Sequence, residues 1–216
     1  MSDAAAHLLA YYSPLAGERV ELSAASVLYT PRSPLLGANA VYPAAGGISE
    51  GLAWLRARGA PPLVASSGRI EDAQEILRLR VGRYTRQAAP GTVMVEQVSR
   101  LQLVAFAEVL ARSWDLPQWA SALGRSLAHS LESLRDFTLL MAYDAGQAVG
   151  ALLVVKRDAH LWGVTDSRAL PALLDAAADL TGGAVNTSCP PEAAVQLDGE
   201  SSVSYWLLHD NALFMR

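Results

Sequence analysis

The sequence contains one cysteine, one lysine and no long apolar run. Because Cys189 has no second cysteine to pair with, an internal disulfide is excluded, which fits a reducing compartment. No apolar segment reaches the length that a bilayer-spanning helix needs. The first residues carry an acidic side chain where a signal peptide would be basic, and the apolar stretch after it is short. We therefore expect a cytoplasmic protein with no membrane partner.

Basic clusters and metal-ligand patterns are missing as well. The formal net charge is −4 and the sequence pI is near 5.5. Nucleic-acid-binding proteins usually carry a basic stripe, and no run of Lys or Arg occurs here, so no nucleic acid is expected as a partner. The 4 His residues are scattered without ligand spacing. The sequence therefore predicts no metal site.

The composition that is present indicates a compact globular protein. Of the 216 residues, 51% are apolar and 18% are charged, which is enough to bury a sizeable core. The Pro90-Gly91 turn signal separates two periodic segments and is the best boundary in the chain. We expect an N-terminal α/β portion over 1–90 and a second domain over 91–216, with a weak echo between them that allows a duplicated unit.

The second half is organised around residues 137–183. Three strand-length apolar runs are separated by a turn at 144–146 and a polar break at 156–158. A helix follows, with its apolar face at Leu170, Leu173, Leu174, Ala177 and Leu180. Gly182 is placed to end this helix in a left-handed conformation.

The flanking segments supply further elements. A strand over 92–98 is followed by a capping box, Ser99 with Gln102, that starts the first of two helices. A short strand over 184–187 and a closing hairpin of 203–208 with 212–216 follow residue 183. In the first half we expect an irregular lead-in over 1–19, strands within 20–30, a loop with a short strand over 39–42, a helix near 48–55 and a strand over 63–65. A helical stripe over 70–84 completes this half.

The order from Thr92 to Arg216 resembles the GNAT superfamily of N-acyltransferases. The hairpin at 144–153, DAGQAVGALL, and the strand LWGV at 161–164 carry the likeness, and the loop GANAV at 37–41 is similar to the N-terminal portion of certain bacterial members. The resemblance implies an α/β fold: a mixed, mostly antiparallel central sheet flanked by helices, with a reduced N-terminal α/β half.

The resemblance also implies a mechanism. Acetyl-CoA or another acyl-CoA would lie between two strands that splay apart, against Trp162, Gly163 and Val164. Its pyrophosphate would sit at the start of the following helix, at Arg168 and Ala169, where backbone N–H donors and the helix dipole favour an anion. A small-molecule or peptide amine would then attack the thioester. Asp166 as base and Tyr205 as acid would be the catalytic pair.

The residues after Val164 depart from the family pattern. The chain reads TDSRALPALL, without the glycines that let the backbone approach a phosphate closely. Pro171 has no N–H to donate, and Asp166 adds a negative charge. Arg168 therefore either neutralises a pyrophosphate or is merely solvated, and Asp166 acts either as a base or as a helix cap.

The sequence allows a functional role or a packing role for several other side chains. Tyr205 acts either as an acid or as a packing residue of an aromatic strand. Trp114 and Trp119 either line the acceptor side or pack between two helices, and Asn39 is typical of turn geometry.

Two functions follow from this evidence. The first is an N-acyltransferase that moves an acyl group from acyl-CoA to an unknown amine. The second is a catalytically inactive relic of that fold that serves as a binding or regulatory module, with a homodimer as one form. Fold alone does not decide between them.

Overall fold

The computed structural model describes residues 3–44, 47–87, 91 and 93–208. Within these ranges the chain forms five α-helices and eleven strands. The helices are α1 (Asp3–Tyr12), α2 (Ser49–Arg56), α3 (Leu103–Ser113), α4 (Ala120–Ser133) and α5 (Ala169–Leu180). The strands are β1 (Glu18–Glu21), β2 (Ala25–Tyr29), β3 (Val41–Pro43), β4 (Leu63–Ser66), β5 (Ala73–Thr85), β6 (Met94–Val98), β7 (Phe137–Asp144), β8 (Gln147–Val155), β9 (Asp158–Val164), β10 (Ala184–Cys189) and β11 (Asp198–Leu208).

The chain divides into two compact units. Unit 1 comprises residues 1–80 and 201–216, and unit 2 comprises residues 81–200. The chain passes from one unit to the other twice, inside β5 and inside β11. The expected boundary at residue 90 therefore differs from the observed ones, since the sequence offers no turn signal inside either crossing strand. Whether unit 1 is a reduced copy of unit 2 stays a prediction.

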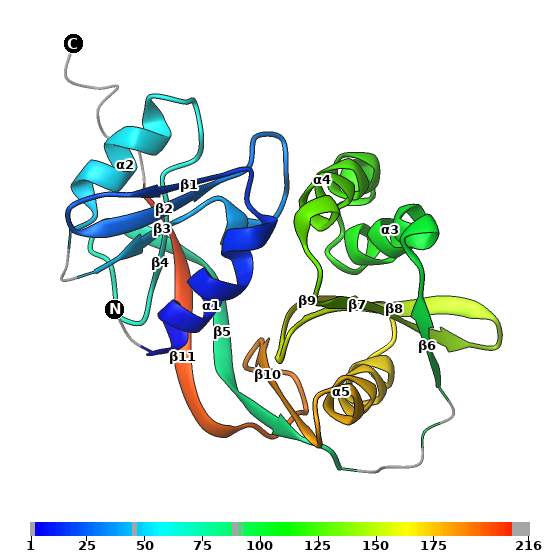
Figure 1. Ribbon diagram of the computed structural model, residues 1–216. Coiled ribbons are helices and arrows are strands. Elements are labelled where there is room, and N and C mark those ends of the chain that lie inside the picture. Colours follow the sequence, from blue (N-terminus) through cyan, green and yellow to red (C-terminus); the bar gives the residue numbers. More distant parts are fainter. Residues whose placement is uncertain (1–2, 45–46, 88–90, 92, 209–216) are drawn as a thin grey trace. The chain divides into compact units, whose positions relative to one another are not determined.

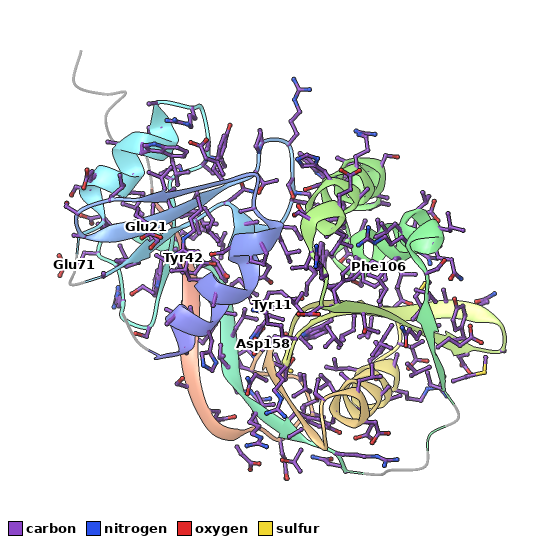
Figure 2. The ribbon with its side chains drawn as sticks, in the orientation of Figure 1. Tyr11, Glu21, Tyr42, Glu71, Phe106 and Asp158 are labelled. Carbon is purple, nitrogen blue, oxygen red and sulfur yellow. The ribbon has the colours of Figure 1, made fainter. Side chains whose placement is uncertain are left out.

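Unit 1 contains a mixed sheet with helices on both faces. β2 pairs with β1 and β3, β3 pairs in parallel with β4, and β4 pairs with β11. Alternation along β3 sends Val41 toward the core of α2 and Tyr42 toward α1 (Figure 2). The Tyr42 hydroxyl donates to the Gly37 carbonyl at 2.7 Å and lies 3.5 Å from the Tyr205 hydroxyl.

Unit 2 contains the expected meander. β6, β7, β8 and β9 pair antiparallel in sequence order, and β10 pairs in parallel with β9. Helices α3 and α4 cover one face of these strands and α5 covers the other (Figure 1). Phe106 of α3 is fully buried against the sheet (Figure 2). Most of the apolar face expected for α5 packs with alternate residues of β7 and β8, such as Leu140 and Leu152, in one core cluster, whereas Leu180 at the end of the helix is exposed.

The local signals around α3 and α5 are confirmed. Ser99 and Gln102 form both bonds of the capping box ahead of α3. Gly182, after α5, has a φ of +86°, which a glycine adopts without steric cost. The tight turn between β7 and β8 has positive φ at Ala145 and Gly146, as a two-residue hairpin loop requires. The α/β class and the mixed, mostly antiparallel pairing are confirmed too.

Three expectations about the first half and the C-terminus need comment. The helix over 70–84 is wrong: the residues from Ala73 onward form β5, because Leu77, Leu79 and Val81 alternate with arginines at the period of a strand. The irregular lead-in over 1–19 is wrong, since α1 occupies most of it and Leu8, Tyr11 and Leu15 are buried. The second strand of the closing hairpin, 212–216, lies outside the described residues.

Candidate functional site

The ladder between β9 and β10 covers two residues of each strand, at the start of β9 and in the middle of β10. Pairing is limited to Asp158 with Asn186 and Ala159 with Thr187, although β9 continues to Val164 and β10 to Cys189. Two side-chain bonds support this short pairing: Asn186 Nδ2 donates to Asp158 Oδ1 at 2.8 Å, and Thr187 Oγ1 donates to the Ala159 carbonyl at 2.7 Å. Asp158 marks the place in Figure 2.

An extra residue in β9 explains why the pairing stops there. On the β8 side, Val155 faces Asp158 and Leu153 faces Leu161, so three residue steps on β9 oppose two on β8. Such a bulge bends its own strand and interrupts the ladder. β9 therefore leaves β10 directly after Ala159. We call the region between Trp162 on β9 and Ser188 on β10 the divergence point.

At the divergence point, the indole N–H groups of two tryptophans donate hydrogen bonds to backbone carbonyls. The Trp162 Nε1 donates to the Ser188 carbonyl at 2.7 Å, which links the two strands beyond the end of their ladder. The Trp162 carbonyl in turn accepts a bond from Trp114 Nε1 at 3.3 Å. Backbone groups of a strand without a neighbour need such partners when they are removed from water. Two backbone acceptors that face the divergence point are thus already bound within the chain.

The start of α5 is shaped by a cluster of charged side chains. Arg168 precedes the helix, and its guanidinium Nη2 lies 2.6 Å from Asp166 Oδ2 and 2.7 Å from Asp144 Oδ2. Asp166 Oδ1 also accepts the backbone N–H of Arg168 at 2.9 Å. The N–H of Ala169 donates to the Asp166 carbonyl at 3.0 Å. Two of the donors that a helix start would offer to an anion are therefore satisfied by one residue.

Electrostatics at this cluster favour its charged form. The Arg168 hydrogen bonds lower the pKa of Asp166, and the two aspartates raise the pKa of Arg168. Two carboxylates against one guanidinium leave a formal charge of −1 on these three side chains. An incoming phosphate would meet this negative charge and would have to displace a carboxylate from Arg168.

Comparison with known proteins was made by sequence and by structure. No protein-family model and no curated protein sequence matches the chain. Among solved structures, a GCN5-related N-acetyltransferase from Kribbella flavida is 12% identical, with a TM-score of 0.63 over 99% of this chain and 98% of that one. A functionally unknown conserved protein from Staphylococcus epidermidis is 13% identical, with a TM-score of 0.55 over 89% of this chain and 95% of that one. This chain has the GCN5-related N-acetyltransferase fold.

Within this acetyltransferase fold, the predicted cofactor residues lie together in unit 2. Trp162, Gly163 and Val164 end β9, and Arg168 and Ala169 begin α5. Gly163 is buried, because the end of α3 approaches it closely: a Cβ built on Gly163 would overlap the Ser113 hydroxyl. Cofactor binding by these residues stays a prediction. The structure brings them together without a glycine in the loop that connects them.

The two residues predicted to be catalytic lie in different units. Asp166 belongs to unit 2, whereas Tyr205 belongs to the part of β11 in unit 1, where it pairs with Ala65 of β4. Burial, more than its neighbour Tyr42, raises the pKa of Tyr205 well above its usual value. The phenol is 1% exposed, as its packing reading implies. A catalytic role for either residue remains a prediction.

Sequence reasoning missed three contributors to this site. Asp144 was seen only as a turn residue, although it supplies the second carboxylate to Arg168. Trp114 was assigned to packing or to the acceptor side, and its N–H instead binds the β9 backbone. The Ser188 carbonyl carried no sequence signal. Asn39 does serve turn geometry, since its side chain binds Thr30, Ser33 and Leu35 backbone groups.

Within the described ranges, no three His, Cys, Asp or Glu side chains gather closely enough to hold a metal ion. In the same part of the chain, every helix is too short or too polar to cross a membrane.

Proposed function

We propose that the protein is a non-catalytic binding or regulatory module built on the N-acetyltransferase fold. The observation that carries the proposal is the arrangement at the start of α5. In the mechanism implied by the fold, this helix start must receive the cofactor pyrophosphate through free N–H groups and positive charge. Here Asp166 takes the Arg168 N–H and, with Asp144, its guanidinium.

The residues that follow reinforce this reading. Pro171 lies in the first turn of α5 and has no N–H. Leu170 is 5% exposed and belongs to the core beneath the helix, so it cannot move aside for a phosphate. The start of α5 thus has fewer free N–H donors for an anion than the start of an ordinary helix. The Asp166 carboxylate already occupies the position that an anionic ligand would take.

The second candidate is an acyl-CoA-dependent N-acyltransferase. The bulge in β9 and the early end of its pairing with β10 favour it, because they preserve the strand divergence that the mechanism uses. The acceptor would be an amine on a small molecule or a peptide. For the non-catalytic module, the expected partner is a second copy of the chain, and sedimentation velocity of the purified protein tests this self-association.

Calorimetric titration with acetyl-CoA and with CoA separates the two candidates. We expect no heat and no rise in melting temperature at millimolar ligand. Micromolar binding that is lost in Arg168→Ala would overturn the proposal and support the acyltransferase.

A gain-of-binding variant tests the cause directly. Replacing both carboxylates, in Asp144→Asn with Asp166→Asn, frees the Arg168 guanidinium while keeping side-chain shape. We expect inorganic pyrophosphate to bind this double variant more tightly than the wild type, with a salt-dependent affinity. Glu108→Gln with Glu132→Gln, on α3 and α4, is the matched control, because it removes two exposed carboxylates and changes the net charge by the same amount. Equal pyrophosphate affinity in the double variant and the wild type would mean that the carboxylates are not what excludes an anion.

A further inference from the structure

Exposed apolar side chains of unit 2 come mainly from β6 and the start of α3. In the part of the chain that the structure describes, Met94 of β6 is 57% exposed, Leu101 in the turn before α3 is 94% exposed, and Val104 of α3 is 69% exposed. Val95 packs against the α5 core cluster, so alternation along β6 turns Met94 toward the face of the sheet that α3 and α4 cover (Figure 1). Apolar side chains exposed together on one face mark a surface that another molecule covers.

The start of α3 carries an apolar patch between two opposite charges. Leu101, Val104 and Ala105 are spaced at i, i+3 and i+4, so they lie on one side of the helix, and all three are exposed. The exposed Glu108 continues this side at i+7, and the exposed Arg100 directly precedes Leu101. We call these five residues the α3 patch. Residues eight positions apart are separated by about 12 Å along a helix, so Arg100 and Glu108 of one chain cannot form an ion pair with each other.

The Arg100 side chain is held in place but keeps donors for a further partner. Its guanidinium carbon lies 4.8 Å from the centre of the Phe137 ring, and its Nη2 donates to the Leu134 carbonyl at 3.2 Å. A guanidinium has five N–H donors, so others remain for a carboxylate at this exposed position. The Arg100 charge is therefore already oriented before any partner binds.

We propose that the α3 patch is the contact between two copies of this chain, packed about a two-fold axis at Val104. The axis sets the two α3 helices antiparallel, so position 100 of one protomer faces position 108 of its partner. Arg100 then pairs with the partner's Glu108 at each end of the contact, and the apolar residues meet between the two pairs. A parallel arrangement would place equal charges against each other. The patch is complementary to itself in charge, and a second copy of the chain therefore fits it.

The dimer rests on the self-association proposed for the non-catalytic module and gives that association a surface. Two short helix faces bury less area than a standard interface, so we expect a weak dimer with a dissociation constant of about 10–100 µM. Sedimentation velocity of the full chain over a concentration range that brackets this value should show a sedimentation coefficient that rises with concentration. Leu101→Lys places a charge inside the contact and should weaken association at least about ten-fold. Leu180→Lys is the matched control, because Leu180 is 52% exposed on α5, which covers the other face of the sheet, and this variant should associate like the wild type.

Reversal of the two charges tests the antiparallel arrangement. Arg100→Glu alone brings two carboxylates together at each end of the contact, and Glu108→Arg alone brings two guanidinium groups together. Each variant should therefore associate at least about five-fold more weakly than the wild type. An equimolar mixture of the two variants restores opposite charges in both pairs, so it should associate about as tightly as the wild type. Glu192→Arg, in the exposed segment before β11, is the control for a reversed charge and should leave association unchanged.

The mixture separates pairing between chains from effects within one chain. Loss of the Arg100 contacts with Phe137 and Leu134 would persist in the mixture, whereas repulsion between protomers would be relieved. The proposal is overturned if the wild type stays monomeric at the highest concentration, if Leu101→Lys associates like the wild type, or if the mixture associates no better than its two components. Tight binding of acetyl-CoA in the calorimetric titration would refute the non-catalytic function without changing any of these association measurements.

Discussion

Substitution of Gly163 by alanine should destabilise unit 2 through a single added methyl group. The new Cβ would overlap the Ser113 hydroxyl and lie 3.0 Å from the Ser113 Cβ and 3.3 Å from Leu110 Cδ2. The hydroxyl cannot easily turn away, because it donates to the Leu110 carbonyl at 2.7 Å. Overpacking of this kind costs about 2 kcal/mol. For a chain of this length, the melting temperature should then fall by about 4–8 °C.

A double-mutant cycle assigns that cost to its cause. Ser113→Ala removes the overlapping hydroxyl but keeps the Cβ at 3.0 Å, so it should recover about half of the loss, with a coupling near 1 kcal/mol. Urea unfolding followed by circular dichroism measures all four corners of the cycle. Gly124→Ala is the control: its Cβ would meet only Ala107 Cβ at 3.5 Å and the Leu103 carbonyl at 4.0 Å, and alanine favours a helix, so this variant should be slightly more stable.

Two outcomes of the cycle would contradict this account of the Gly163 contact. If Gly163→Ala unfolds within about 0.5 kcal/mol of the wild type, the spread of ordinary surface substitutions, then α3 does not approach β9 as closely as described. If Gly163→Ala is destabilised but Ser113→Ala gives no recovery, the contact that matters is with Leu110 instead.

Three further predictions concern other contacts. The Asp166 carboxyl should titrate below its ordinary pKa of 3.8 in a carbon-13 NMR titration, and Arg168→Ala should move its pKa upward; the stabilisation from this pair is present above the ordinary pKa and is lost as pH falls through the lowered one. Tyr42→Phe should lower the free energy of unfolding by about 1 kcal/mol or more, and Tyr205→Phe should lower it by less. Only Tyr42→Phe leaves the Gly37 carbonyl without its 2.7 Å hydrogen bond. Equal losses of stability in urea unfolding would contradict this. Asp175→Ala should lower the free energy of unfolding by about 1–3 kcal/mol. Its Oδ1 accepts hydrogen bonds from the Tyr84 hydroxyl at 2.8 Å and from the Gln87 N–H at 3.0 Å. Asp179→Ala, which breaks the exposed ion pair with Arg86, should lower it less in the same urea-unfolding measurement.

Strongly local signals made unit 2 predictable from its sequence. The strands over 137–164 are bounded by turn residues, and the face of α5 repeats at helical spacing, so each element specifies itself. The same is true of the capping box at Ser99. Neighbouring strands in the meander also pair in sequence order, which requires no long-range information.

Elements that depend on distant partners were harder to predict. In the segment 70–84, the residues 70, 73, 77, 81 and 84 fit a helical stripe, whereas Leu77, Leu79 and Val81 fit the alternation of a strand. Only contacts with the rest of the fold select the strand β5. The division of β11 between two units likewise has no local signal, since its residues form one continuous strand. The buried residues Leu8 and Tyr11 of α1, with Leu15 in the turn after it, are spaced at helical intervals in the sequence, but the segment was expected to be irregular.

The candidate site was predictable in composition but not in connectivity. The missing glycines and Pro171 indicated an unusual helix start. The partnership of Arg168 with Asp144 depends on bringing the β7–β8 turn beside the start of α5, 24 positions along the chain. The bond from the Trp162 side chain to β10 could not be predicted from the sequence either. Every strand residue has a backbone carbonyl, and the bulge in β9 determines that the indole reaches the carbonyl of Ser188.

The return of the chain to unit 1 sets an order for synthesis. Strand β4 obtains its second neighbour only from residues 204–207 of β11. During synthesis that segment emerges after β1 to β4 and after the whole of unit 2. Unit 2 has all of its own residues by position 200 and can fold while the end of β11 is still being made. Until then β4 presents an unpaired edge, the kind of surface that recruits other chains. During translation, the edge of β4 therefore needs protection from aggregation until β11 has been made.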